Sequence, residues 1–124
     1  IESIADVCVQ MERTIWNKNE AKAWFSQEMR DDLFSLFSLV TEALETMNEN
    51  LAQEYRPGIL ARASENEIKI NELRDNLIHH NKQRIESGEY NYKQCAFYDE
   101  LLNHCEKLAE HVINVNQAIA SNTK

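Results

Sequence analysis

The sequence predicts an all-α protein, and three observations support this prediction. The 124 residues include two glycines and one proline, so few positions interrupt a helix. Apolar residues recur at steps of three and four along the chain, which is the period of an amphipathic helix. Turn residues are few, which favours long helices joined by short loops. We therefore expect residues 1–124 to form one domain, an up-and-down antiparallel bundle with one N-terminal helix and a three-helix unit.

The first helix is predicted over residues 1–18. Its apolar residues step by three and four: Ile1, Ile4, Cys8, Met11 and Ile15. Residues 17–19, Asn-Lys-Asn, loosen this pattern and predict the first turn. The pattern is already under way at Ile1, without an initiator methionine, so we expect the helix to continue from a longer protein.

The second helix is predicted from Ser26 to Gln53, at the start of a three-helix repeat over residues 25–121. Its apolar stripe approaches a heptad pattern, widened by Phe37, and consists of Met29, Leu33, Leu36, Val40, Leu44, Met47 and Leu51. The helix is expected to end at Arg56-Pro57-Gly58, because proline cannot continue the hydrogen-bond ladder and glycine tolerates the turn.

The third helix is predicted from Leu60 to Glu86. Ile78 lies at the flank of its core side, which consists of Ala63, Ile70, Leu73, Leu77 and Ile85. Ser87-Gly88 ends the pattern. Residues 89–93 form a polar loop, in which Tyr90 and Tyr92 are expected to pack over the end of the bundle.

The fourth helix is predicted from Tyr98 to Ala120. Its apolar stripe consists of Phe97, Leu101, Leu108, Val112, Val115 and Ile119. The roughly opposite side carries Asp99, Asn103, Glu106 and Glu110. Two carboxylates four residues apart on a helix have Cβ atoms about 5–6 Å from each other, so they either share a hard cation or repel each other.

The charge of the chain excludes some classes of partner. It carries 13 basic and 21 acidic residues, for a net charge of −8, which argues against nucleic acid and against an anionic membrane surface. The longest apolar run, residues 33–40, contains two serines and is far shorter than the roughly 20 residues that span a bilayer. Cys8, Cys95 and Cys105 lack zinc-site spacing and are predicted to be reduced core thiols of a cytosolic protein.

Two short segments of the chain repeat one pattern. Residues 2–6 read Glu-Ser-Ile-Ala-Asp, and residues 106–110 read Glu-Lys-Leu-Ala-Glu, followed by His111 and Asn114. These segments, and the region from Glu65 to Ala120, resemble the PhoU-like domain, whose helices carry a pattern like E-R-I-G-D-H-x-x-N-I. The resemblance covers nearly the whole chain. It implies that residues 1–18 are the last part of one unit's third helix and that a complete second unit follows.

The resemblance also implies a function. The chain is similar to the cytoplasmic C-terminal region of a bacterial sodium/phosphate cotransporter, on the cytoplasmic side of the inner membrane. Such a domain is not an enzyme, and it regulates phosphate uptake through contacts on its helix faces. Its expected partner is the transmembrane region of the same chain or a phosphate-transport or signalling protein, and a homodimer is also expected. A free-standing PhoU-type regulator is the first alternative.

Metal sites built from acidic pairs on neighbouring helices are a further implication of the resemblance. One site would combine Glu106 and Glu110 with Glu67 and Asn71, while the first copy, Glu2 and Asp6, would be incomplete. The longer Glu110 and the uncharged Asn71 both stand where the family has Asp. The expected cofactor is therefore a weakly bound divalent or ferric ion. The alternative is that these are solvated carboxylates on polar faces.

The histidines and tryptophans allow other interpretations of the function of the chain. His79 or His80, followed by Lys82, resembles the phosphoacceptor of a histidine-phosphotransfer bundle, although Gln83 stands where a small residue is expected. His104 and His111 lie on the flank of the fourth helix's stripe and are predicted to be half-buried packing residues. Trp16 and Trp24 are predicted to cap the core, with an exposed partner surface as the alternative. We find no nucleophile paired with a base and no glycine-rich phosphate loop, so we expect no catalysis.

Overall fold

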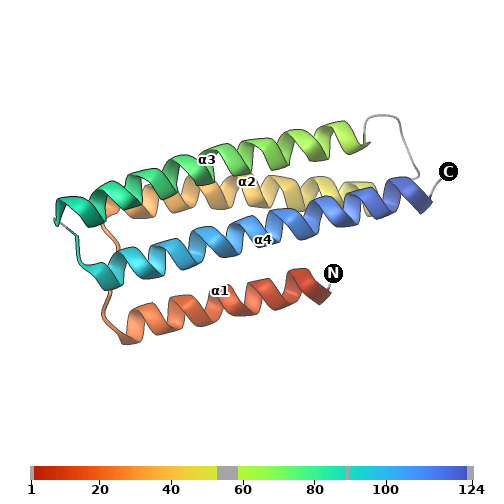
Figure 1. The fold of residues 1–124 in the computed structure, drawn as a ribbon. Helices are drawn as coiled ribbons and strands as arrows, with labels where there is room; N and C mark the ends of the chain where they lie inside the picture. Colours follow the sequence, from red (N-terminus) through yellow and green to blue (C-terminus); the bar gives the residue numbers. More distant parts are fainter. Residues whose placement is uncertain (1, 53–58, 89, 123–124) are drawn as a thin grey trace.

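The computed structural model of the protein describes residues 2–52, 59–88 and 90–122, and these ranges fold into four helices without a strand. The helices are α1 (Glu2–Glu20), α2 (Gln27–Ala52), α3 (Ile59–Ser87) and α4 (Tyr92–Asn122), as Figure 1 shows. The all-α prediction is confirmed. None of the four helices, within the described ranges, is long and apolar enough to cross a membrane.

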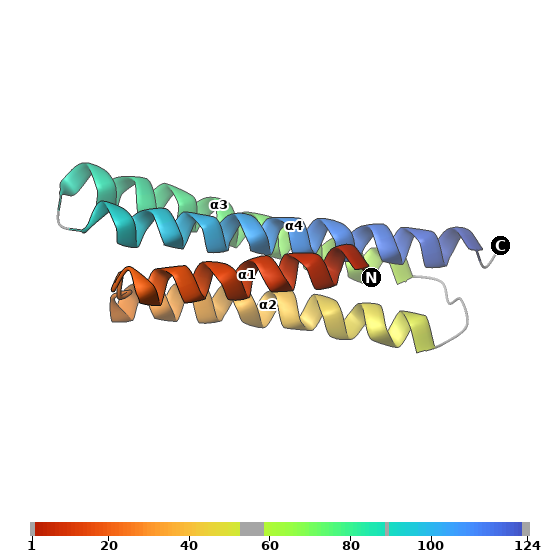
Figure 2. The same cartoon turned by 90° about the horizontal axis from the view of Figure 1, so that it is seen from below.

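The helices α2, α3 and α4 pack against one another, and α1 lies along α4 at the edge of the bundle (Figures 1 and 2). Among the described residues, Cα atoms of α1 come within 8 Å of Cα atoms of α4 but not of α2 or α3. Arg74 pairs with Glu106 and Asn81 pairs with Asp99, so α3 and α4 run antiparallel. The contacts thus distinguish a three-helix unit from one attached helix.

The end of α1 differs from the prediction. Residues 17–19 were expected to form a turn, but the helix continues to Glu20. The Asn17 carbonyl accepts a hydrogen bond from the Ala21 amide at 3.0 Å, so the helical bonding passes through these residues. Lys22 has a φ of 56°, a left-handed conformation that an α-helix cannot contain, and the chain turns there.

The starts of α2 and α4 follow from side-chain caps. The Ser26 hydroxyl oxygen accepts a hydrogen bond from the Met29 amide at 3.2 Å, which is an N-cap. The Asn91 side-chain oxygen accepts one from the Lys93 amide at 2.8 Å. As a result, α4 begins at Tyr92, six residues before the predicted start. The predicted end of the second helix at Gln53 and its stop signal at 56–58 lie outside the described residues.

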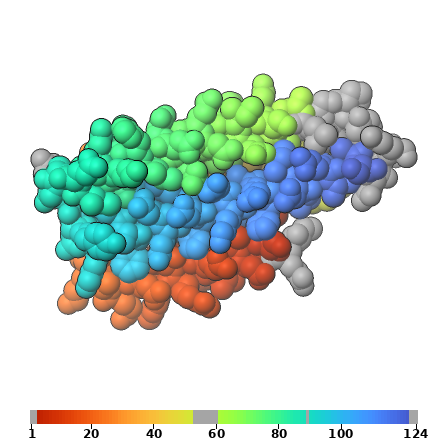
Figure 3. All heavy atoms as spheres, viewed as in Figure 1, coloured from red at the N-terminus to blue at the C-terminus, as the bar shows by residue number. Residues whose placement is uncertain are grey.

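The core is organised around α4, which lies between α1 and α3 in the space-filling view (Figure 3). Since this helix contacts all three others, its buried face is much wider than the predicted stripe. The buried apolar residues of α4 are Cys95, Tyr98, Leu101, Leu102, Cys105, Leu108, Ala109, Val112, Ile113 and Ala120. The predicted stripe members Phe97, Val115 and Ile119 are only half-buried.

Four positions that the sequence assigned to apolar stripes are exposed instead: Cys8, Ile15, Leu51 and Ile85. A straight helix has 3.6 residues per turn, so a stripe read with seven-residue spacing drifts by about 20° per heptad. Near the end of α2, Thr46 and Asn50 have therefore moved into the core in place of Leu51. On α1 the residues facing α4 include Val7 and Thr14, which leaves Cys8 and Ile15 at the side.

Buried amide side chains join the helices at several levels. Asn50 donates to the Asn116 side-chain oxygen at 2.7 Å, and Asn66 donates to the Thr46 hydroxyl at 3.0 Å. Asn81 donates to the Cys95 carbonyl at 3.0 Å. Each of these buried amide nitrogens thus has an acceptor on a neighbouring helix, whereas the buried side-chain oxygen of Asn81 has no partner among the described residues.

Several predictions about single side chains are also settled. Cys95 and Cys105 are buried free thiols, as predicted, and burial raises the pKa of Cys105 to about 12. The core assignment of Cys8 is wrong. Tyr90 packs against the core, whereas Tyr92 is exposed.

Candidate functional site

The predicted metal ligands of α4 point to different neighbours. Glu106 forms a salt bridge with Arg74 of α3, with 2.7 Å between its carboxylate oxygen and Nη2. Glu110 instead lines a groove between α1 and α4. The acidic pair that looked like one unit in the sequence is therefore divided between two helix interfaces, and an arginine neutralises its first member.

Of the two predicted ligands of α3, Glu67 lies at another level of the bundle than Glu106, whereas Asn71 lies level with Ala109. The Arg74–Glu106 and Asn81–Asp99 pairs fix the register of α3 and α4, which places Glu67 level with Ile113. At 1.5 Å per residue, Glu67 is about 10 Å along the axis from the level of Glu106. Asn71, like Glu67, is half-buried. Among the described residues, no three His, Cys, Asp or Glu side chains converge as a metal site would require. Metal binding by these residues stays a prediction.

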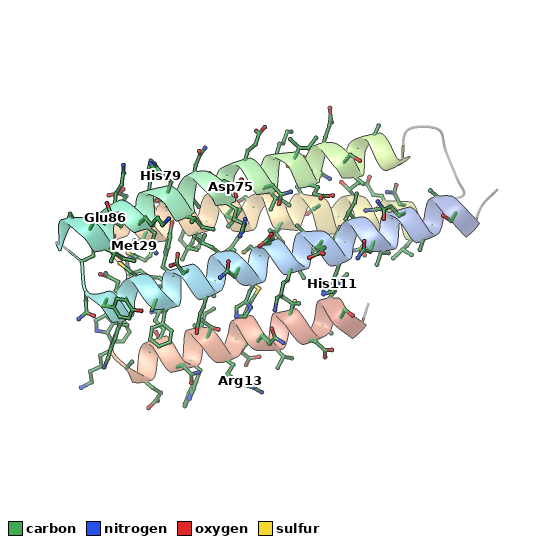
Figure 4. The ribbon with its side chains drawn as sticks, in the orientation of Figure 1. Arg13, Met29, Asp75, His79, Glu86 and His111 are labelled. Atoms are coloured by element: carbon green, nitrogen blue, oxygen red, sulfur yellow. The ribbon has the colours of Figure 1, made fainter. Side chains whose placement is uncertain are left out.

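The groove between α1 and α4 brings the two copies of the repeated motif together. It has a volume of about 350 Å³ and is lined by Ser3, Asp6, Val7, Gln10, Lys107, Glu110, His111 and Asn114. Figure 4 shows His111 on the side of α4 that faces α1. Asp6 and Glu110, the last acidic residues of the two copies, thus share one hollow. The side chain of Glu2 lies outside the described part of the chain.

His104 connects α1 to α4 and is half-buried, as predicted. Its Nε2 lies 3.0 Å from the Thr14 hydroxyl oxygen, whose own proton is donated to the Gln10 carbonyl. Nε2 must therefore carry the imidazole proton, which leaves Nδ1 as a buried acceptor without a partner among the described residues. Burial lowers the pKa of His104, Glu100 opposes this shift and Lys107 adds to it.

We expect this histidine to make the fold less stable in mild acid. Because the pKa of His104 is lower in the folded chain, its neutral form stabilises the fold above about pH 6.5, and that stability is lost as the pH falls through the folded-state pKa. The free energy of unfolding in urea should decrease from about pH 7.5 to about pH 5.5, and this decrease should be smaller in the His104→Gln variant. The His111→Gln variant is the control, and its free energy of unfolding should decrease as much as that of the original chain. Equal decreases in all three proteins would contradict the assignment.

The predicted phosphoacceptor histidines lie on the exposed side of α3. Figure 4 places His79 on the outer side of this helix, and His80 is exposed beside it, with the two ring centres 6.4 Å apart. The Gln83 amide nitrogen lies 3.4 Å from Nε2 of His79. The side chain at the position where a small residue was expected therefore sits against the nitrogen that would accept a phosphoryl group.

Sequence reasoning missed a buried cation at the end of the bundle near the α3–α4 connection. Arg84 is only 6% exposed, and its Nη2 lies 2.9 Å from Glu28 and 3.1 Å from Asp32, both on α2. Its guanidinium also lies over the rings of Tyr90 and Tyr98, at 5.5 and 5.3 Å from their centres. The signal was present, since Glu28 and Asp32 are four residues apart and so share one face of α2.

Beside this cluster is a second hollow, of about 300 Å³, lined by Glu28, His80, Gln83, Arg84, Ser87 and Tyr90. Burial raises the pKa of Tyr98 to about 12, so its hydroxyl stays protonated at neutral pH. The cluster joins α2, α3 and α4. Because two carboxylates surround one guanidinium, it does not leave a net positive charge for an anionic ligand.

No protein-family model, curated protein or solved structure matches the chain. The PhoU-like resemblance of its motifs therefore stays a prediction.

Proposed function

We propose that this chain is a non-catalytic, PhoU-like regulatory module of a bacterial sodium-dependent phosphate transporter, on the cytoplasmic side of the inner membrane. It modulates phosphate uptake through contacts on its helix faces. In this proposal α2, α3 and α4 form an up-and-down three-helix unit, and α1 is the last helix of a preceding unit. The motif resemblance of residues 65–120 supports the assignment.

The observation that carries the proposal is the shared groove of Asp6 and Glu110. These residues occupy the same position in two copies of one motif, and they come from helices that are far apart in sequence. Two repeats of one helical unit that pack through equivalent helices bring equivalent positions together. The groove is what a pair of such units would produce at their contact.

The packing of α1 suggests how contacts on this surface affect the rest of the module. Since α1, within the described chain, approaches the other helices along α4 alone, a partner that moves α1 acts first on the groove and on the Thr14–His104 bond. A partner that prefers one position of α1 then shifts the population of that state. Metal binding by Glu106, Glu110, Glu67 and Asn71 would also act on α4, across its contact with α3.

Phosphate uptake by cells that carry the full-length gene tests this proposal. Asp6→Asn combined with Glu110→Gln should change the initial rate of sodium-dependent phosphate uptake by about fivefold or more, the lower range of a typical coupling between sites. The matched control is Glu42→Gln with Glu45→Gln, which removes two charges from the exposed side of α2. All proteins must be present in equal amounts. Unchanged uptake in the groove variant would overturn the proposal.

A free-standing phosphate-signalling regulator is distinguished by fractionation. In the proposed transporter, the product of the full-length gene stays with the membrane after washing with high salt. Recovery of the product in the soluble fraction would favour the free-standing regulator.

A histidine-phosphotransfer bundle is the candidate of a different class, and the exposure of His79 and His80 favours it. The contact of Gln83 with His79 opposes it. Incubation with phosphorylated receiver domains separates the two functions, because a stable label that disappears in His79→Asn or His80→Asn would replace the transporter proposal.

A further inference from the structure

The helix α1 has two different long faces. Its inner face, toward α4, carries Val7 and Thr14, which are buried, together with Ile4 and Met11, which pack against the core. Its outer face carries the exposed residues Ala5, Val9, Glu12, Arg13 and Trp16. Figure 4 shows Arg13 on the side of α1 turned away from α4. The helix therefore presents a complete second face that no described residue covers.

The centre of this outer face is apolar. Val9 is 52% exposed and Trp16 is 64% exposed, although they are the kind of side chains that proteins usually bury. They are seven residues apart and so lie nearly in line on the helix. Val9, Glu12, Arg13 and Trp16 together line a shallow hollow of about 320 Å³. The prediction that Trp16 caps the core is wrong, as it also is for the exposed Trp24. Trp16 instead belongs to this surface.

The charges on the two flanks of the outer face select a partner. Successive residues are about 100° apart, so Glu12 and Arg13 lie on opposite sides of the Val9–Trp16 line. If two copies of α1 pair in parallel about a two-fold axis, the Glu12 flank of each faces the Arg13 flank of the other. In an antiparallel pair, each flank meets its own equivalent, and like charges face each other. The face is therefore complementary to itself in one orientation only.

We propose that two copies of this chain associate through the outer faces of α1 as a parallel helix pair. Val9 and Trp16 of each copy meet their equivalents at the centre, and Glu12 pairs with Arg13 of the second copy on both sides. In Figure 1 the helices α2, α3 and α4 all lie on one side of α1, so its other side is open to a second copy. This inference goes beyond the proposed function and competes with one part of it, because a preceding unit that contains α1 would cover the same outer face.

The strength of the association follows from its size. One helix face per copy buries less surface than the roughly 1,200–2,000 Å² of a standard stable interface, so we expect a dissociation constant of about 10–100 μM. Most of the affinity should come from the tryptophan, since exposed aromatic residues at the centre of an interface are typical hot spots.

Sedimentation equilibrium over a range of concentrations tests the surface. The original chain should dimerise, and Trp16→Lys should raise the dissociation constant about tenfold or more. The matched control is Phe34→Lys, because Phe34 is 65% exposed but lies on α2. It should dimerise like the original chain. A chain that stays monomeric at every concentration, or an equal loss in the control, would overturn the proposal and leave the face to another partner.

Charge reversal tests the orientation. Glu12→Arg alone and Arg13→Glu alone should each weaken the dimer, because each places like charges across the interface. The variant that carries both reversals should dimerise like the original chain. If the loss of dimer affinity in the double variant equals the sum of the losses in the two single variants, the pairing of Glu12 with Arg13 is contradicted.

Disulfide trapping is an independent test of the parallel orientation of the two α1 helices. In a Cys8→Ser background, Val9→Cys places two equivalent thiols opposite each other in a parallel pair, and mild oxidation should produce a covalent dimer. Cys95 and Cys105 are buried and do not compete. If covalent dimer forms only when Val9→Cys and Trp16→Cys chains are mixed, the pair is antiparallel and the proposal is wrong.

Discussion

Leu36→Ala is expected to lower the free energy of unfolding by about 2–5 kcal/mol, as measured by urea denaturation at neutral pH. Leu36 is completely buried in the core cluster, where α2 meets its neighbours. The substitution removes apolar contacts and leaves a cavity that a packed helical core closes only in part.

Leu51→Ala is the matched control, because the sequence places both leucines in one apolar stripe of α2. Leu51 is 47% exposed, so we expect a change of about 0.5 kcal/mol or less. If both substitutions destabilise the chain equally, the end of α2 packs with the heptad register, and the buried positions of Thr46 and Asn50 are wrong.

Arg84→Ala is expected to destabilise the chain by about 2–4 kcal/mol, also by urea denaturation. The change removes the cation that pairs with Glu28 and Asp32, and it removes the guanidinium from the faces of Tyr90 and Tyr98. The exposure of the Glu28 side chain, at 64%, keeps the loss below that of a fully buried ion pair, because water solvates the carboxylate that remains.

The control for this substitution is Arg62→Ala. Arg62 pairs with Glu49 at 2.9 Å, nearly the same distance, but both side chains are about half exposed. Exposed pairs contribute little, so we expect a change of about 0.5 kcal/mol or less. Equal losses in the two variants would show that burial of Arg84 has no energetic consequence.

Local signals in the sequence predicted the helices well. Ser26 marks the start of α2 because its hydroxyl caps the helix. Gly88 follows the last residue of α3 and has a φ of 72°, the left-handed conformation in which glycine commonly ends a helix. The turn at 17–19 was misplaced because asparagine is common in turns but also tolerated in helices. What stopped α1 was the backbone of Lys22, which has no sequence signature.

The candidate site was predicted less well, because periodicity shows which face a residue occupies but not which residue stands opposite. The spacing of Glu106 and Glu110 was correct, yet nothing in it revealed that Arg74 would neutralise the first and that Asp6 would face the second across a groove. Arg84 was overlooked for the related reason that a charged residue is normally assigned to the surface. Its burial depends on two carboxylates that are more than 50 positions away in the sequence.

In the part of the chain that the structure describes, α1 contacts α4 but neither α2 nor α3, and this affects how the molecule opens. To leave the bundle, α2 and α3 must each break contacts with two neighbours and α4 with three, whereas α1 must break contacts with one. Proteins open in cooperative units whose free energies follow such differences in packing. The amide hydrogens of α1 should therefore exchange with solvent through a smaller opening than those of α4. The inner surface that this opening uncovers includes Thr14 and His104, so the least protected unit of the molecule also carries its acid-sensitive contact.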